Sequence, residues 1–324
     1  MQYYFRFNRL YFSKLATLAL LLIVVSGAFA QQTFTVTTLQ DSDPYQDINS
    51  PSAVKSLRWA IQKANAYNGS SNIVFNIDPS FAVNGKYPIV FDDEHGNILI
   101  NKSVTIDGST QPGFVAGQSP VVILKKEEGN SYFGFIQLNS DGGCVIKNLG
   151  FELPGDTYPI VFDVNSPNNQ FFNNQFVINT TMIGSCGVIQ VYSANNNIIE
   201  NNKFFGPSNA LTGYAAILLY GETKNTLVKD NLIKNFIVGI YDVSYTQQDY
   251  YAFNTYTKNI ITNSVETYCV PSDPNSYCNT YNGTNTIMNN VPKPEIFTYS
   301  GGILTGKAHV PFDVIEIFVA DYKD

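Results

Sequence analysis

The stretch Asn173–Phe176 has the sequence Asn-Asn-Gln-Phe, and related motifs follow at Asn201–Phe204 (Asn-Asn-Lys-Phe) and Asp230–Ile233 (Asp-Asn-Leu-Ile). The motifs recur at intervals of 28 and 29 residues. Self-similarity at a fixed period of this length is typical of solenoids. Short apolar runs flank each motif, so each repeat is expected to bury its strands against the neighbouring repeats.

Repeats of 26 to 29 residues, counted from Asn148 onward, are long enough for three strands and three turns. Short β-branched and aromatic runs between turn residues continue from Ile73, as expected for strands. No helical pattern separates these runs after Tyr67, which argues against a doubly wound sheet or an α/β barrel. We therefore predict an all-β fold, a right-handed parallel β-helix solenoid with an N-terminal capping helix.

Stacked coils place equivalent asparagines above one another, where their side-chain amides can donate and accept hydrogen bonds along the axis. Glycan contact is the alternative role for these side chains. Their recurrence at one coil position favours the structural role. We predict a structural ladder from four residues: Asn148, Asn174, Asn202 and Asn231.

One segment has a clear helical pattern. From Ser52 to Tyr67 the apolar residues Leu57, Ala60, Ile61 and Ala64 share one face, and Ser52 is expected to cap the start. Such a helix suits the end of a solenoid, where it covers the edge of the first coil. The predicted organisation is a signal peptide (1–30), an N-terminal cap (31–72), a parallel β-helix (73–292) and a C-terminal cap or the start of an incomplete second β domain (293–324).

The first thirty residues have the three parts of a secretory signal. Basic residues precede an apolar run over residues 15–25, and Ala28–Ala30 offers a small-residue cleavage site. The apolar run is shorter than the roughly 20 residues of a spanning helix, and no later segment is apolar enough to cross a bilayer. We expect a secreted or bacterial cell-surface protein, either monomeric or part of a larger surface protein.

The acidic composition limits the choice of partners. Removing residues 1–30 leaves 16 basic and 26 acidic residues, a net charge of −10. This balance argues against nucleic acid as a partner and suits cations or neutral glycans. Four cysteines are compatible with an oxidising compartment. We favour a disulfide between Cys269 and Cys278, with two unpaired thiols as the alternative, and expect Cys144 and Cys186 to be small buried residues.

Several motifs resemble a known family. They are Ser56–Ile61 (Ser-Leu-Arg-Trp-Ala-Ile), Ile73–Ile77 and Val104–Gly113, which contains Asp-Gly-Ser-Thr-Gln-Pro-Gly. The chain resembles secreted bacterial right-handed parallel β-helix repeat proteins of the pectate-lyase-like superfamily over roughly residues 33–292. The resemblance implies the fold, and places the chain near large cell-surface or adhesin-like proteins. One fold hosts many activities, so the resemblance does not assign a reaction.

The superfamily also contains polysaccharide lyases and glycoside hydrolases, which makes an enzyme the alternative function. Hydrolysis by the common route needs two carboxylates across the scissile bond. The one dense acidic cluster, around Asp92 and Asp93, has no second carboxylate pair at coil spacing to face it, and His95 and His309 lie far apart. Arg58 is on the predicted cap helix, which leaves no arginine for the coils. We therefore expect no catalysis and name no catalytic residue.

Two further groups of residues are candidate ligand sites. Asp41, Asp43 and Asp47 offer carboxylates for calcium, but the segment lacks the glycine and terminal glutamate of an EF-hand loop. A flexible acidic linker is therefore favoured, and neither a metal nor a cofactor is predicted. A tyrosine-rich stretch between Asp242 and Thr257 interrupts the repeat and is predicted to be a protruding loop. Exposed rings there would suit sugar or protein surfaces, although packing of the rings in the core or within the loop is the favoured interpretation. The candidate ligand-binding residues are Tyr245, Tyr250, Tyr251 and Tyr256. The predicted function is structural or adhesive, with loops presented to glycan or protein.

Overall fold

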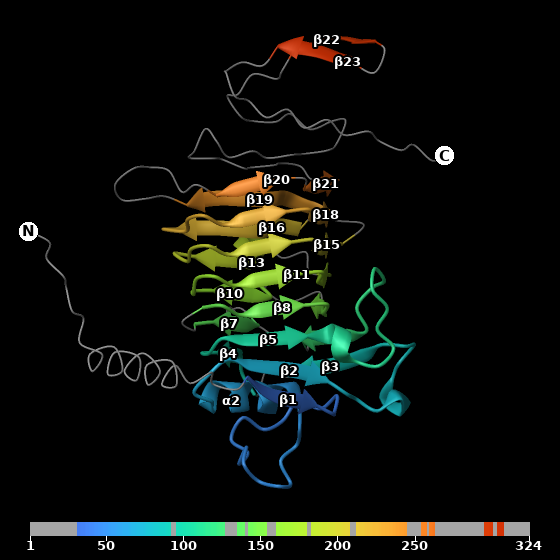
Figure 1. The fold of residues 1–324 in the computed structure, drawn as a ribbon, viewed down its shortest axis with the longest axis vertical. Helices are drawn as coiled ribbons and strands as arrows, with labels where there is room; N and C mark the ends of the chain where they lie inside the picture. The colour runs from blue at the N-terminus through green and yellow to red at the C-terminus, as the bar shows by residue number, and fades with distance from the viewer. Residues whose placement is uncertain are drawn as a thin grey trace, which may run out of the picture.

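A computed structural model shows the fold, drawn in Figure 1. The structure describes residues 31–91, 95–126, 135–139, 142–153, 160–179, 183–207, 212–244, 254–257, 259–262, 295–300 and 303–307. The predicted signal peptide and the predicted disulfide Cys269–Cys278 lie outside these residues. Within the described residues, no helix is long and apolar enough to cross a bilayer.

The chain winds into stacked coils, and each coil contributes a strand to each of three sheets in turn (Figure 1). All neighbouring strands in these sheets are parallel, which confirms the predicted right-handed parallel β-helix. Sheet 1 contains β1 (Gln32–Val36), β2 (Ser71–Phe75), β5 (Val104–Asp107), β8 (Val145–Lys147), β11 (Gln170–Phe172), β14 (Ile198–Glu200), β17 (Leu227–Lys229) and β20 (Thr255–Thr257).

The other two sheets complete each coil. Sheet 2 contains β3 (Tyr87–Phe91), β6 (Val122–Lys126), β9 (Gly150–Leu153), β12 (Gln175–Ile178), β15 (Lys203–Phe205), β18 (Leu232–Lys234) and β21 (Ile260–Thr262). Sheet 3 contains β4 (Ile98–Ile100), β7 (Ile136–Leu138), β10 (Phe162–Val164), β13 (Ile183–Tyr192), β16 (Thr212–Gly221) and β19 (Phe236–Ser244). Short 3-10 helices occupy Pro79–Phe81 (η1) and Gly108–Thr110 (η2).

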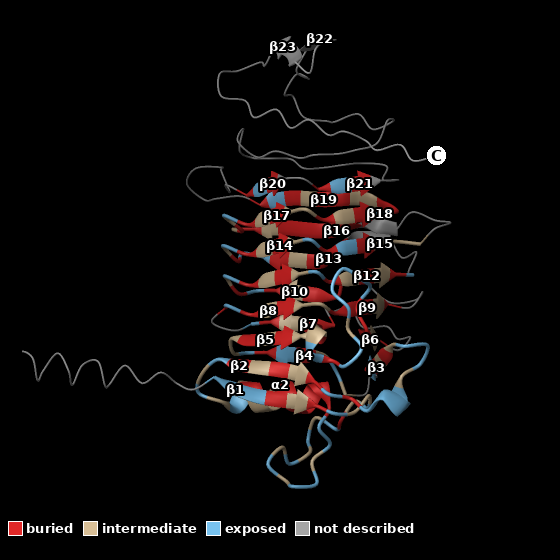
Figure 2. Cartoon of the chain, turned by 45° about the vertical axis from the view of Figure 1, so that its right-hand side comes forward, coloured by how far each residue is buried: buried red, intermediate tan, exposed pale blue. Residues whose placement is uncertain are grey.

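The interior is filled by side chains that stack from coil to coil. Phe151, Phe176 and Phe204 occupy one register position of sheet 2, and consecutive ring centroids lie 4.9 and 4.6 Å apart with the rings nearly parallel. Buried residues run along the stacked strands, as the red positions of Figure 2 show. Each coil therefore shields the apolar face of the next, which is the packing that the repeat predicts.

The N-terminal helix covers the first coil. Helix α2 spans Leu57–Ala66 beside β1 and β2 at the base of Figure 1, and its predicted apolar face is fully buried. The predicted start at Ser52 was wrong. Ser56 is the N-cap, because its hydroxyl accepts a hydrogen bond from the Trp59 backbone N–H at 3.0 Å.

A buried ion pair fixes this cap. Two guanidinium nitrogens of Arg58 donate to the Asp41 carboxylate at 2.7 and 2.8 Å, and Arg58 also donates to the backbone carbonyls of His95 and Gly96. Asp41 is thus committed to the cap, while Asp43 accepts a hydrogen bond from the Tyr45 backbone N–H. No cluster of three potential metal ligands occurs in the described part of the chain.

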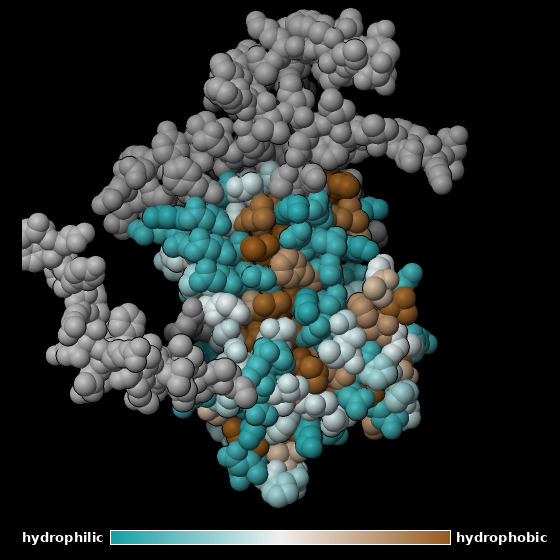
Figure 3. Space-filling view, viewed as in Figure 1, coloured by the Kyte–Doolittle hydropathy of each residue, from teal (hydrophilic) through white to brown (hydrophobic). Residues whose placement is uncertain are grey.

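The outer faces differ between sheets. On sheet 1, Val145, Gln170, Ile198 and Leu227 occupy one outward register position, and three of these four half-buried side chains are apolar. Figure 3 shows a narrow, interrupted hydrophobic band between hydrophilic flanks on the face turned to the viewer. Towards the C-terminus, β22 (Glu295–Ser300) and β23 (Ile303–Lys307) form an antiparallel pair of their own, beyond the predicted boundary near Pro292.

Candidate functional site

The asparagine motifs form the turn between sheets 1 and 2, and the two residues of each pair have different roles. The first residue has a left-handed backbone, with φ of 54° at Asn173, 55° at Asn201 and 53° at Asp230. Asparagine and aspartate tolerate this conformation better than most residues. The second residue points inward and is buried. We call the two sets the outer rank (Asn148, Asn173, Asn201, Asp230) and the inner rank (Asn174, Asn202, Asn231, Asn259).

The inner rank forms the predicted ladder. The side-chain amide of Asn174 donates to Asn202 at 3.1 Å, Asn202 donates to Asn231 at 3.1 Å, and Asn231 donates to Asn259 at 2.9 Å. Each accepting Oδ1 also receives a backbone N–H from the coil before it. The ladder therefore extends one coil beyond the predicted set, to Asn259.

Asn148 was wrongly assigned to this ladder. Its φ of 59° places it in the outer rank, and its amide donates to the Asp107 carboxylate at 2.9 Å. The inner position of that coil is Leu149, whose backbone N–H donates to Asn174 at 3.1 Å. A leucine has no amide to continue the ladder, so the ladder begins at Asn174.

A second, shorter ladder lies at the turn between sheets 3 and 1. The amide of Asn169 donates to Asn197 at 3.1 Å, and Asn254 accepts the Thr226 backbone N–H at 2.9 Å in a later coil. Both asparagines of the first pair are fully buried. The recurrence of asparagine at residues 169 and 197, 28 positions apart, is the sequence signal for it.

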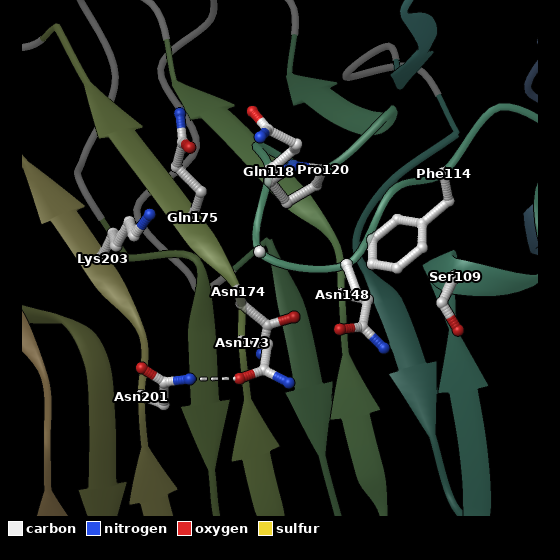
Figure 4. Close-up of a pocket in the computed structure, with 12 residues that line it drawn as sticks. Ser109, Phe114, Gln118, Pro120, Asn148, Asn173, Asn174, Gln175, Asn201 and Lys203 are labelled. Carbon is white, nitrogen blue, oxygen red and sulfur yellow. Dashed lines mark hydrogen bonds between the residues drawn. The ribbon is translucent and has the colours of Figure 1, made fainter.

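A groove opens over the outer rank. Residues 109–120, between β5 and β6, rise alongside the later coils at the right of Figure 1 and overhang the turns between sheets 1 and 2. The groove has a volume of about 520 Å³. Figure 4 shows its lining: Ser109, Phe114, Ala116, Gly117, Gln118, Pro120, Asn148, Asn173, Asn174, Gln175, Asn201 and Lys203.

Six side-chain amides line this groove, and several keep hydrogen-bonding capacity for a ligand. Asn201 donates to Asn173 at 2.6 Å (Figure 4), which leaves the Asn201 carbonyl and the Asn173 amino group, both of groove-lining residues, without a described side-chain partner. The amides of Gln118 and Gln175 form no side-chain hydrogen bond with the described residues. By contrast, the side-chain amino group of Asn174 already donates to the Ile146 carbonyl and to Asn202 within the ladder. The free donors and acceptors therefore come from the outer rank and its neighbours.

Two other side chains shape the groove. The ring of Phe114 is partly buried against the core and lies on the overhanging segment (Figure 4). Lys203, at the start of β15, is the one charged residue in the lining, and its ammonium forms no ion pair with any described residue. The groove thus combines an aromatic face, planar amides and a cation.

The structure contradicts one residue of the predicted tyrosine site. Tyr256 is completely buried, and its hydroxyl donates to the Asp242 carboxylate inside the last described coils. Burial and the Asp242 charge raise the pKa of Tyr256 well above its usual value. This tyrosine is a core residue and presents no face to a ligand. Tyr245, Tyr250 and Tyr251 lie outside the described residues.

The predicted loop from Asp242 to Thr257 is also shorter than expected. β19 continues through Ser244, and β20 begins at Thr255. Asp242 occupies a core position next to Leu219, where it accepts hydrogen bonds from the Ser244 backbone N–H at 2.8 Å and the Asn254 amide at 3.1 Å. A buried carboxylate with such partners fixes the two ends of the connection to the interior.

The structure also shows an exposed tyrosine pair that the sequence analysis missed. Tyr192 and Tyr220 are register partners on the outer face of sheet 3, with ring centroids 4.7 Å apart. The spacing of 28 residues between them is the signal that identifies them. Burial, together with the charges of Asp163 and Tyr192, raises the pKa of Tyr220 to about 12.

The remaining candidate residues lie apart from the groove. Cys144 and Cys186 are buried, as predicted, and burial raises the pKa of the Cys186 thiol to about 12. His95 lies in the N-terminal cap, with Nδ1 3.4 Å from Asp41. Asp92, Asp93 and His309 lie outside the described residues.

Comparisons with known proteins leave the fold and this groove as the basis for an assignment. No protein-family model matches the chain, and no curated protein matches its sequence.

Proposed function

We propose that this chain is an exported structural or adhesion protein of the pectate-lyase-like type, secreted or held at a bacterial cell surface, and that it binds a glycan in the groove over the outer rank. The observation that carries the proposal is the lining of that groove, six side-chain amides beside an aromatic ring. The resemblance of the Ser56–Ile61 and Val104–Gly113 motifs to secreted β-helix proteins supports the exported setting.

The groove chemistry suits sugars. A planar amide offers a donor and an acceptor side by side, which matches the neighbouring hydroxyls of a sugar ring. Phe114 offers an apolar face for the C–H surface of that ring. Concave sites of a few hundred Å³ with a few placed polar groups are the usual form of a small-ligand site.

The rigidity of the coils supports binding through amides. Asn173 and Asn201 stand on turns whose neighbours are locked into the inner ladder, so their positions are set before a ligand arrives. Polar groups that are already ordered lose little conformational freedom on binding. A rigid rod of stacked coils that carries such a groove is suited to attaching the protein to a glycan.

Retention on immobilised glycans tests the proposal. The full chain and a Gln118→Ala, Gln175→Ala variant are passed over pectin, alginate and neutral glycans, with Gln170→Ala as the control because it lies on sheet 1 away from the groove. We expect the wild type and the control to be retained and the double variant to lose retention by about tenfold, the effect of about two hydrogen bonds.

Two results would count against the proposal. Failure of the wild type to bind any of these glycans, or equal retention of the double variant, would reject the groove as the site. Release of unsaturated or shortened sugars would instead support the alternative function, a polysaccharide lyase or glycoside hydrolase, and variants of Asp92 and Asp93 would then test the acidic cluster.

A further inference from the structure

The outer face of sheet 3 carries a second set of groups suited to a ligand. Two adjacent columns of outward side chains run across the coils, and in the middle coils they contain Asp163 and Gln190 in one column and Asn165, Tyr192 and Tyr220 in the other. We call these five residues the tyrosine strip. It belongs to a different sheet from the residues that line the groove.

The tyrosine pair ends abruptly at Tyr192. The Tyr192 ring packs against Tyr220 of the next coil. In the previous coil, the residue at the same position is Asn165, one residue beyond the paired part of β10 and β13, and its side chain is short and exposed. Tyr192 is 47% exposed. Among the described residues, no other aromatic ring stacks on Tyr192 besides Tyr220, and the partly exposed Tyr192 ring is accessible to a flat ligand.

Asp163 is an exception among the outward carboxylates of the described parallel strands. Asp107 pairs with Lys147 at 3.0 Å, Glu200 pairs with Lys229 at 3.1 Å, and Glu152 pairs with Lys125. In each case the lysine comes from an adjacent coil.

No such lysine accompanies Asp163. Its carboxylate accepts a long hydrogen bond of 3.4 Å from Gln190 and forms no ion pair within the described part of the chain. A half-buried carboxylate in the column next to an exposed tyrosine ring favours a cation, because both the negative charge and the ring attract it.

We propose that the tyrosine strip binds a glycan that contains free amino sugars. The ammonium group of one sugar pairs with Asp163, and the apolar face of the ring lies against Tyr192. The hydroxyl groups donate to the side-chain carbonyl of Asn165, whose amide nitrogen donates to Asn139 at 3.1 Å. An amino sugar supplies all three features in one ring. A simple inorganic cation would leave the aromatic face and the amide unused.

This ligand differs from that of the groove, so the inference goes beyond the proposed function. The one charged side chain of the groove lining is Lys203, which repels an ammonium group. The charged residues of the two sites therefore have opposite signs, and a loss of binding at one site is not expected to affect binding at the other.

Isothermal titration with two matched probes tests the proposal. The probes are a trimer of glucosamine and its N-acetylated counterpart, which has the same rings without the positive charges. At about pH 5.5 an amine with a pKa near that of an α-amino group is protonated. We expect the wild type to bind the amino trimer about fivefold more tightly than the acetylated one, the effect of a partly exposed ion pair.

Three variants locate the effect. Asp163→Asn should abolish the preference for the amino trimer, and Tyr192→Ala should weaken binding of both trimers by about threefold. Glu152→Gln makes the same change in charge on sheet 2 and should retain the preference. The groove variant Gln118→Ala, Gln175→Ala should also retain it, which separates this test from that of the proposed function.

Some outcomes would overturn the proposal. These are equal affinity of the wild type for the two trimers, no binding of either, or an Asp163→Asn variant that keeps the preference. Circular dichroism of each variant checks that the fold is intact, and a Tyr192→Phe variant, which keeps the ring, should bind as the wild type does.

Discussion

The inner and outer ranks of asparagines are adjacent in the sequence yet differ in almost every physical respect. Asn202 is 1% exposed and bonded to the coils on both sides, whereas Asn201 is exposed and stands on a left-handed turn. Asparagine is thus used in the inner rank for the hydrogen bonds of its side chain, and in the outer rank because it tolerates a left-handed backbone. In a solenoid, the direction in which a side chain points therefore decides its role.

The largest expected effect is at the inner rank. Asn202→Ala removes the acceptor for the Asn174 backbone and side chain and the donor to the Phe171 carbonyl at 2.9 Å, and all of these groups are buried. Unsatisfied buried polar groups destabilise a protein strongly, so we expect a loss of about 3 kcal/mol in the free energy of unfolding. Chemical denaturation measures it. A loss below about 1 kcal/mol would contradict the importance of the ladder.

At Asn201, in the outer rank, stability should depend mainly on backbone preference, because its side-chain hydrogen bond to Asn173 is exposed to solvent. Asn201→Ala places alanine at a φ of 55°, and alanine lacks the polar side chain that lets asparagine adopt this backbone. We expect the free energy of unfolding to fall by about 1 kcal/mol. Asn201→Gly should be within about 0.5 kcal/mol of the wild type, because glycine adopts this conformation readily. If the two variants are equally stable, the left-handed turn is not what asparagine provides there.

The smallest effect concerns acid stability at the start of the outer rank. Burial acts to raise the pKa of Asp107, but hydrogen bonds from Ser109 and Asn148, together with Lys147, outweigh it and hold the pKa below its usual value. Since the pKa is lowered by folding, the stabilisation is present above the unfolded value of about 3.9 and is lost as pH falls through the folded value.

The corresponding measurement compares Asp107→Asn with the wild type between about pH 5 and pH 2. The variant should lose less than about 1 kcal/mol at neutral pH, because the group is partly exposed, and its stability should fall less steeply in acid. A wild-type acid dependence in the variant would show that Asp107 does not contribute.

The two candidate binding sites on the surface also differ from each other. The groove gathers amides around Lys203, and the tyrosine strip gathers them around Asp163. Both sites depend on the vertical stacking of coils, since each brings together residues from several repeats. Opposite charges on the same scaffold lead us to expect different glycan preferences.

Much of the fold was predictable because it depends on local pattern. The repeat predicted the coils, the short apolar runs predicted the strands, and the apolar face of residues 57–64 predicted the cap helix. The helix start was predicted wrongly because Ser52 and Ser56 are both acceptable N-cap residues. Only the structure shows that Ser56, with its extended backbone, directly precedes the first helical residue. The burial of Cys144 and Cys186 was also correct.

The candidate sites were less predictable, for a different reason. Asn148 was misassigned because a two-residue turn offers an inward and an outward position, and the sequence of one coil does not distinguish them. Tyr256 resembled an exposed tyrosine in a polar stretch, but Asp242, fourteen residues earlier, provides the buried partner that makes it a core residue.

The sequence by itself determined the period of the coils, the β-strand content and the position of the cap, because these follow from the spacing of apolar and turn residues along the chain. Tertiary structure alone decided which asparagine of each pair points inward, that residues 109–120 overhang Asn201 and Lys203, and that Asp163 forms no ion pair with any lysine the structure describes. The physical reason is that these features depend on side-chain direction and on contacts between coils, which local spacing does not specify.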